Sequence, residues 1–158
     1  MASTAHGKSW WVRQMSDPPL HIRTFIYPDD YEMVYDLWAN AGPGIHLRRS
    51  DEPGELQKKL QRDPDLFLVA ELDGRLVGAV LGGYDGRRGL VYHLAVAQEY
   101  RQRRIGAALM QALEERLRAK GCIRYYLLVT NDNDSAMRFY ESQGWNRMDI
   151  QIYAKDLE

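Results

Sequence analysis

Hydrophobic and polar positions along the chain follow two repeats, and each repeat predicts one kind of element. Seven short segments are rich in apolar, β-branched or aromatic residues, and we interpret them as strands: 20–26, 66–72, 75–84, 90–96, 123–129, 145–148 and 150–154. Four others place apolar residues on one face at helical spacing: 28–41, about 53–63, 105–120 and 136–143. The predicted order is therefore β-α-α-β-β-β-α-β-α-β-β.

The turns between the predicted strands indicate how the strands pair. Asp73-Gly74 is a strong hairpin signal, and a second turn over 85–89 leads into the strand at 90–96. The strands from 66 to 96 are therefore expected to form an antiparallel meander. Residues 90–129 read as strand, helix, strand, which predicts two parallel strands joined by a right-handed crossover. Together these features predict an α/β fold with a mixed central sheet and helices on both faces.

Length and composition narrow the class of protein. The 158 residues suit one domain, which we assign to 19–158, preceded by a polar extension over 1–18 that lacks the apolar core of a signal peptide. The net charge of −1 gives no overall basic field for nucleic acid. No apolar stretch is long enough to span a membrane. The single cysteine, Cys122, excludes a disulfide framework or zinc site within the chain and fits a reducing cytoplasm, so no metal is expected.

The junction between the strand at 90–96 and the following helix concentrates positive charge. Arg101, Arg103 and Arg104 lie close together and are followed by Gly106. A helix N-terminus carries partial positive charge and unpaired N–H groups. Small residues let a ligand approach the backbone closely, and arginine pairs well with phosphate. We therefore expect a site for a small phosphate-bearing ligand here.

Two motifs and the order of elements resemble the GNAT superfamily, the GCN5-related N-acetyltransferases, and the resemblance covers about 20–157. The first motif is the acetyl-CoA loop, here Ala95-Val96 followed by Arg101-Gln102-Arg103-Arg104-Ile105-Gly106. The second is Asn133-x-x-Ala136-x-x-Phe139-Tyr140-Glu141-x-x-Gly144-Trp145. The runs 65–71 and 82–86 resemble a small bacterial subgroup. One position departs from the pattern, because Arg104 stands where the family usually has glycine.

The resemblance implies acetyl-CoA as co-substrate and a place for each part of it. The strands at 90–96 and 123–129 would splay apart to admit the pantetheine arm, which backbone groups of Leu94 and Val96 would bond. N–H groups of the loop would hold the pyrophosphate, and Asn133 would contact the arm unless it is a turn or cap residue. The implied cofactor-binding residues are Leu94, Ala95, Val96, Arg101, Gln102, Arg103, Arg104, Ile105, Gly106, Ala107 and Asn133.

Acetyl transfer to an amine needs a proton donor for the leaving thiolate and a base for the amine. The resemblance implies Tyr140 as the donor, the alternative being a core aromatic beside Phe139. A lysine-like amine is mostly protonated at pH 7, so a base is expected. Tyr92 and His93 are candidates, and Glu71 lies on a neighbouring strand. Adjacent strand residues face opposite ways, so Tyr92 and His93 are not both expected at the site, and His93 is alternatively a packed histidine.

These observations favour a cytoplasmic N-acetyltransferase that moves an acetyl group from acetyl-CoA to a primary amine of a small molecule or protein by direct attack in a ternary complex. The loop with His46, Arg48 and Arg49 would suit an acidic acceptor, unless it is merely solvated. A CoA-binding regulatory or partner-binding module with little catalysis is the alternative. Many relatives dimerise, so a homodimer stays open. A Rossmann fold is disfavoured, because Gly-x-Gly-x-x-Gly is missing and the strands form a meander.

Overall fold

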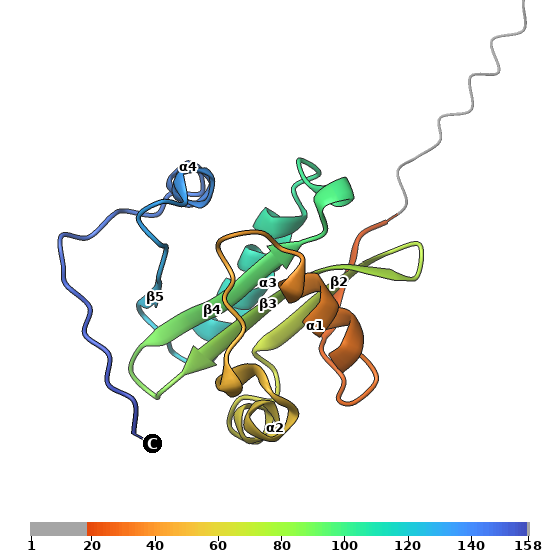
Figure 1. The fold of residues 1–158 in the computed structure, drawn as a ribbon, viewed down its shortest axis with the longest axis horizontal. Helices are drawn as coiled ribbons and strands as arrows, with labels where there is room; N and C mark the ends of the chain where they lie inside the picture. Colours follow the sequence, from red (N-terminus) through yellow and green to blue (C-terminus); the bar gives the residue numbers. More distant parts are fainter. Residues whose placement is uncertain (1–18, 158) are drawn as a thin grey trace, which may run out of the picture.

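The structure is a computed structural model that describes residues 19–157, so the extension predicted over 1–18 lies outside the described residues. Within this range five strands form one sheet in the order β1-β2-β3-β4-β5 (Figure 1). The strands are β1 (His21–Thr24), β2 (Phe67–Leu72), β3 (Arg75–Tyr84), β4 (Gly89–Val96) and β5 (Tyr125–Leu127).

The pairing of the strands agrees with the predicted meander and crossover. β1, β2, β3 and β4 pair in an antiparallel manner, each with the next. β5 joins β4 in a parallel pair, as expected for two strands connected through a helix. This parallel pair is short, because it begins at Gly89 and Tyr125 and ends at Val91 and Leu127.

Four α-helices connect or follow the strands: α1 (Tyr31–Ala39), α2 (Pro53–Arg62), α3 (Ile105–Ala119) and α4 (Asp134–Ser142). Two short 3-10 helices, η1 (Arg49–Asp51) and η2 (Gln98–Tyr100), precede α2 and α3. Residues at the boundaries explain where two of these helices begin or end. Pro53 is the first residue of α2, where a missing N–H costs nothing. Gly121 follows α3 with φ +81°, a left-handed conformation suited to glycine.

Helices cover both faces of the sheet (Figure 1). α3 packs on one face, where buried side chains of the helix meet those of β2, β3 and β4. α1 and α2 cover the other face, with Trp38 and Leu56 buried against Phe67 and Val69 of β2. We call these the α3 face and the α1/α2 face. No helix within 19–157 is both long and apolar enough to cross a membrane.

The C-terminal segment differs from the sequence-based expectation. The strands predicted at 145–148 and 150–154 are wrong, because the structure has no strand over 145–157, and the strand predicted over 123–129 shrinks to β5. Trp145 packs against the core, but the apolar side chains farther along this segment are exposed. Ile150 is 55% exposed and Ile152 is 59% exposed. An alternating pattern gives a strand only where a neighbouring strand supplies hydrogen bonds and packing, which this segment lacks.

Candidate functional site

β4 and β5 separate partway along their length, and this opening is the centre of the candidate site. Their last paired residues are Val91 and Leu127, whereas β4 continues to Val96. The outer edge of β4 beyond Val91 therefore lacks a β5 partner. Unpaired strand edges offer backbone N–H and C=O groups to a ligand. Leu94, Ala95 and Val96, predicted to bind a cofactor, lie on this stretch.

The loop that leads from β4 into α3 has an unusual backbone conformation. Gln102 has φ +62° and Arg104, at the N-cap of α3, has φ +60°. Both lie in the left-handed region, which costs a residue other than glycine roughly 1 kcal/mol or more. Such conformations turn successive N–H groups toward one concavity and are often retained at functional sites. They adjoin the first amides of α3, at Ile105, Gly106 and Ala107, which have no acceptor inside the helix.

The three arginines of this loop point to different neighbours. Arg101 folds back, with Nε 3.1 Å from the carbonyl oxygen of Val96 and Nη2 2.8 Å from that of Ala41. The guanidinium of Arg103 stacks over the Tyr100 ring, 5.3 Å from its centroid. The Arg104 side chain instead lines a cavity beside α3. Of the three, only Arg104 lines this cavity.

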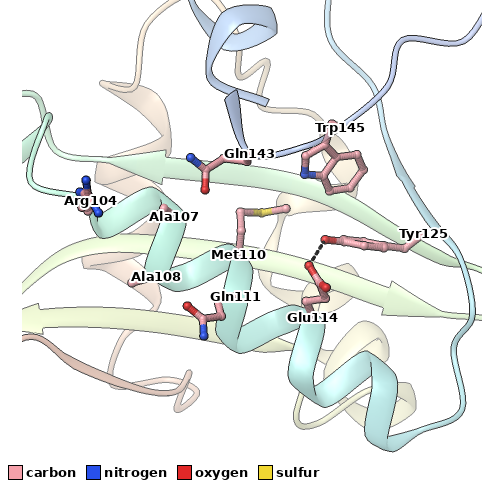
Figure 2. Close-up of a pocket in the computed structure, with 9 residues that line it drawn as sticks. All are labelled: Arg104, Ala107, Ala108, Met110, Gln111, Glu114, Tyr125, Gln143 and Trp145. Carbon is pink, nitrogen blue, oxygen red and sulfur yellow. Dashed lines mark hydrogen bonds between the residues drawn. The ribbon is translucent and has the colours of Figure 1, made fainter. Parts of the chain in front are cut away.

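The cavity beside α3 has a volume of about 340 Å³. Figure 2 shows it between α3 and the chain that follows α4. Its lining residues are Arg104, Ala107, Ala108, Met110, Gln111, Glu114, Tyr125, Gln143 and Trp145. The Tyr125 hydroxyl donates to Oε2 of Glu114 at 2.9 Å. Burial raises the pKa of Tyr125, and the hydrogen bond to Glu114 raises it further. Because Arg104 and Ala107 also belong to the helix start, the cavity adjoins the loop expected to hold phosphate.

Tyr140 of α4 lies on the α3 face of the sheet, where it packs against the core. Its ring centroid is 5.1 Å from that of Phe139 and 5.8 Å from that of Trp145. Burial raises the pKa of Tyr140 to about 12, so its phenol keeps its proton at neutral pH. Phe139 also holds α4 against the start of α3, because a Cβ atom at Gly106 would lie 3.3 Å from its Cζ.

Asn133 is the N-cap of α4. Its Oδ1 accepts a hydrogen bond from the N–H of Ala136 at 3.1 Å, which confirms the cap interpretation. Its amide group also faces the loop after α1, since a Cβ at Gly44 would lie 2.4 Å from Nδ2. Arg101 reaches the same loop through the carbonyl of Ala41. Two residues predicted to bind the cofactor therefore hold this loop in place.

A β-bulge in β4 places both base candidates on the same face of the sheet. His93 pairs with Leu81 but Val91 pairs with Gly82, so Tyr92 is an extra residue in β4. The prediction that Tyr92 and His93 face opposite ways is wrong for this reason. Tyr92 lies over Gly83 in the direction of Lys59 of α2. Its side chain is 53% exposed, and the burial of the remainder raises the pKa of its phenol.

His93 points into the α1/α2 face and forms a close pair with a buried acid. Its Nε2 lies 2.9 Å from Oδ1 of Asp51, a residue only 4% exposed. The other carboxylate oxygen of Asp51 accepts the N–H of Arg48 at 2.9 Å. The Trp38 ring packs edge-on against the imidazole at 4.9 Å. The sequence analysis did not single out Asp51, and no sequence signal indicated that it would meet β4.

The remaining polar candidates lie outside this arrangement. Glu71 is bound by Arg23, with Oε1 2.6 Å from Nη2, and this ion pair lowers the pKa of the glutamate. Glu71 is therefore held as a carboxylate in this ion pair, on the β1 side of the sheet. His46, Arg48 and Arg49 are exposed. Cys122 is buried, with its thiol donating to the carbonyl of Arg124 at 3.2 Å.

No cluster of three or more His, Cys, Asp or Glu side chains suited to a metal occurs within the described part of the chain. The polar groups near the opening are instead a phenol on one face and a carboxylate–imidazole pair on the other. Together with an opened parallel strand pair and a loop at a helix start, they make up the candidate site.

Comparison with known proteins gives the family. The chain belongs to the GNAT acetyltransferases, because the model of the acetyltransferase (GNAT) family matches residues 31–145. An acetyltransferase of Pectobacterium atrosepticum is 42% identical over 139 residues, which cover 87% of this chain and 96% of that protein.

Two solved structures have the same fold. Ard1 from Thermoplasma volcanium matches with a TM-score of 0.69 and 28% identity, over 79% of this chain and 81% of that one. The PaiA N-acetyltransferase from Thermoplasma acidophilum, solved in complex with coenzyme A, matches with a TM-score of 0.71 and 22% identity, over 84% and 93%. The protein is therefore an acetyltransferase of the GNAT fold.

Proposed function

We propose that this acetyltransferase transfers the acetyl group of acetyl-CoA to a primary amine by direct attack, with both substrates bound at once. The observation that carries the proposal is the parting of β4 from β5 after Val91 and Leu127. A helix start lies at the end where β4 stops, and the two faces of the sheet carry titratable side chains, Tyr140 on one and His93 on the other. A thioester inserted between the strands would therefore be accessible to an amine from the α1/α2 face.

The cofactor is held mainly by backbone groups in this proposal. The edge of β4 over Leu94 and Val96, which has no strand partner, bonds the pantetheine arm as an added strand would. The first amides of α3 and the turned backbone at Gln102 and Arg104 bind the pyrophosphate. The guanidinium of Arg104 adds a charge-assisted contact. The complex of the PaiA N-acetyltransferase with coenzyme A supports the choice of cofactor for this fold.

Positioning accounts for much of the catalysis, and Tyr140 handles the leaving group. The amine, once neutral, attacks the thioester carbonyl carbon, so a C–N bond forms and the C–S bond then breaks. Tyr140 gives its proton to the departing sulfur and regains one that the new amide nitrogen sheds. A raised pKa suits this role, because the phenol arrives protonated at neutral pH. Holding both reactants in one opening lowers the entropic part of the barrier.

Two measurements on the intact chain test the proposal. Thermal shift with acetyl-CoA reports binding, and release of free thiol over a panel of primary amines reports transfer. We expect stabilisation by acetyl-CoA and amine-dependent thiol release with at least one acceptor. Binding without release on any amine would contradict catalysis and support a CoA-binding module. The variant Tyr140→Phe provides the control, since it should still bind acetyl-CoA but release thiol slowly.

A further inference from the structure

The Asp51–His93 pair has the geometry of a base with its orienting partner. An ionised carboxylate can only accept hydrogen bonds, so the 2.9 Å contact places the proton of a neutral imidazole on Nε2. Nδ1 then carries the lone pair. Trp38 covers one side of the ring, yet the His93 side chain remains 16% exposed. The imidazole is therefore fixed in tautomer and orientation, and part of the side chain stays accessible.

The position of His93 along β4 places it where an acceptor would arrive. It lies two residues beyond Val91, the last residue of β4 that pairs with β5. Its side chain faces α1 and η1, whereas Tyr140 lies on the α3 face. A thioester in the opening would thus have a proton donor on one face and a proton acceptor on the other. Attack on one face of the planar thioester carbonyl could then be followed by protonation of the departing sulfur from the other face.

From this geometry we infer that His93 is the base that deprotonates the acceptor amine and that Asp51 is its positioning residue. The inference rests on the proposed N-acetyltransferase function. The ammonium form of the acceptor gives one proton to Nδ1 of His93, which passes it to solvent after the reaction. The neutral amine then attacks as described above. The carboxylate of Asp51 stabilises the imidazolium that forms and holds the ring in place.

The pair also couples the base to the loop between α1 and α2. Asp51 ends η1, and its second oxygen holds the N–H of Arg48. The Tyr31 hydroxyl donates to the backbone carbonyl of Asp51 at 3.3 Å. Any movement of this loop on acceptor binding would therefore reorient the imidazole. Through these contacts, a shift of the loop would reach His93 by way of Asp51.

The decisive experiment compares His93→Gln and Asp51→Asn with the wild type on two acceptors. One acceptor is a lysine-like alkylamine, protonated at pH 7, and the other is a weakly basic amine such as a hydrazide, neutral at pH 7. We expect His93→Gln to lower kcat/KM for the alkylamine about 10²- to 10⁴-fold at pH 7. The loss should shrink at least tenfold for the weakly basic amine. A structural role would affect both acceptors alike.

Asp51→Asn tests the positioning role separately. We expect a loss in kcat for the alkylamine with little change in KM, because the imidazole loses the carboxylate that fixes its tautomer and orientation. A higher KM with an unchanged kcat would contradict the inference, since it would mean that Asp51 only supports the acceptor loop. Acetyl-CoA binding, followed by thermal shift, should survive both substitutions.

The outcomes separate this inference from the proposal beneath it. Thiol release by the wild type, with equal losses of His93→Gln on both acceptors, overturns the base assignment and leaves the acetyltransferase intact. Acetyl-CoA binding by the wild type without thiol release on any amine overturns both. If His93→Gln lowers the melting temperature, the ratio of its rates on the two acceptors remains valid, because both rates come from the same folded fraction.

Discussion

Tyr140 and His93 lie on opposite faces of the sheet, one packed on the α3 side and the other held against α1 and η1. At this level of the sheet, β4 no longer pairs with β5. This relationship depends on the bulge at Tyr92, since without the extra residue His93 would follow the alternation set by Val91 and face α3. One inserted residue therefore decides on which side of the cofactor the base candidate stands.

Replacing Tyr140 by phenylalanine should slow transfer without unfolding the protein. The substitution removes the phenol and keeps the ring that packs on Phe139 and Trp145. The thiolate then leaves without a positioned proton donor, and we expect kcat to fall about 10²-fold or more. The measurement is thiol release at saturating acetyl-CoA. An undiminished kcat would show that Tyr140 is a core aromatic only.

The pH dependence of the Tyr140 step follows from its raised pKa. A phenol with a pKa of about 12 stays protonated from pH 6 to pH 10, so the donor should impose no basic limb on kcat in that range. The raised pKa of Tyr140 also determines how its contribution to the free energy of unfolding changes with pH. The folded state holds the proton more tightly than the unfolded chain, so this contribution is complete below about pH 10 and is lost as the pH rises toward 12. Chemical denaturation of wild type and Tyr140→Phe across this range checks the difference.

The left-handed residues of the cofactor loop give a matched pair of variants. Gln102→Gly and Arg104→Gly each relieve a positive φ, near +60° in both residues. Relief of strain is offset by the greater entropy of glycine in the unfolded chain, so we expect each variant to gain at most about 1 kcal/mol in the free energy of unfolding.

Only one variant of this pair should lose cofactor affinity. Arg104→Gly also removes a guanidinium beside the start of α3, and we expect the Kd for acetyl-CoA to rise about 5- to 20-fold. Gln102→Gly removes no charge and should bind as the wild type does. Isothermal titration of both variants at one ionic strength makes the comparison. Equal affinities would mean that the Arg104 side chain points away from the phosphates.

Local sequence signals predicted the parts of the site that a short stretch of chain builds by itself. The loop from Val96 to Gly106 lies between a strand and a helix, as expected. Arg104 in this loop stands where the family pattern usually has glycine. The structure shows why, since Arg104 adopts the conformation that favours glycine. The cap at Asn133, which the sequence analysis held as the alternative to a cofactor contact, is likewise a local feature, because capping depends on neighbours three residues away.

Features that depend on distant partners escaped sequence reasoning. The bulge at Tyr92 is a matter of register between β3 and β4, which alternation within one strand does not encode. The contact between Asp51 and His93 joins residues 42 positions apart. The C-terminal strands failed for a related reason, because the alternation of Ile150 and Ile152 predicts a strand but not a partner to pair with. These are also the features that decide which chemistry the opening supports.

A buried ion cluster at the far edge of the sheet should set the acid stability of the protein. Arg23 of β1 lies between Asp30 and Glu71, with Nη1 2.6 Å from Oδ2 of Asp30 and Nη2 2.6 Å from Oε1 of Glu71. Its side chain is only 24% exposed and that of Asp30 is 4% exposed. The guanidinium lowers the pKa of both carboxyls, and they raise its own in turn.

Removal of this guanidinium tests the cluster. Arg23→Met leaves Asp30 as a buried carboxylate without its main partner, and we expect a loss of about 2 to 4 kcal/mol in the free energy of unfolding. Because the carboxyl pKa values are lowered in the folded state, their stabilising effect is present above about pH 4.5 and is lost as the pH falls below it. Wild-type stability should therefore decrease from pH 5 toward pH 3 more steeply than that of Arg23→Met. Urea denaturation of both proteins at pH 7, 5 and 3.5 measures this, and parallel losses on acidification would contradict a role for Arg23 in setting those pKa values.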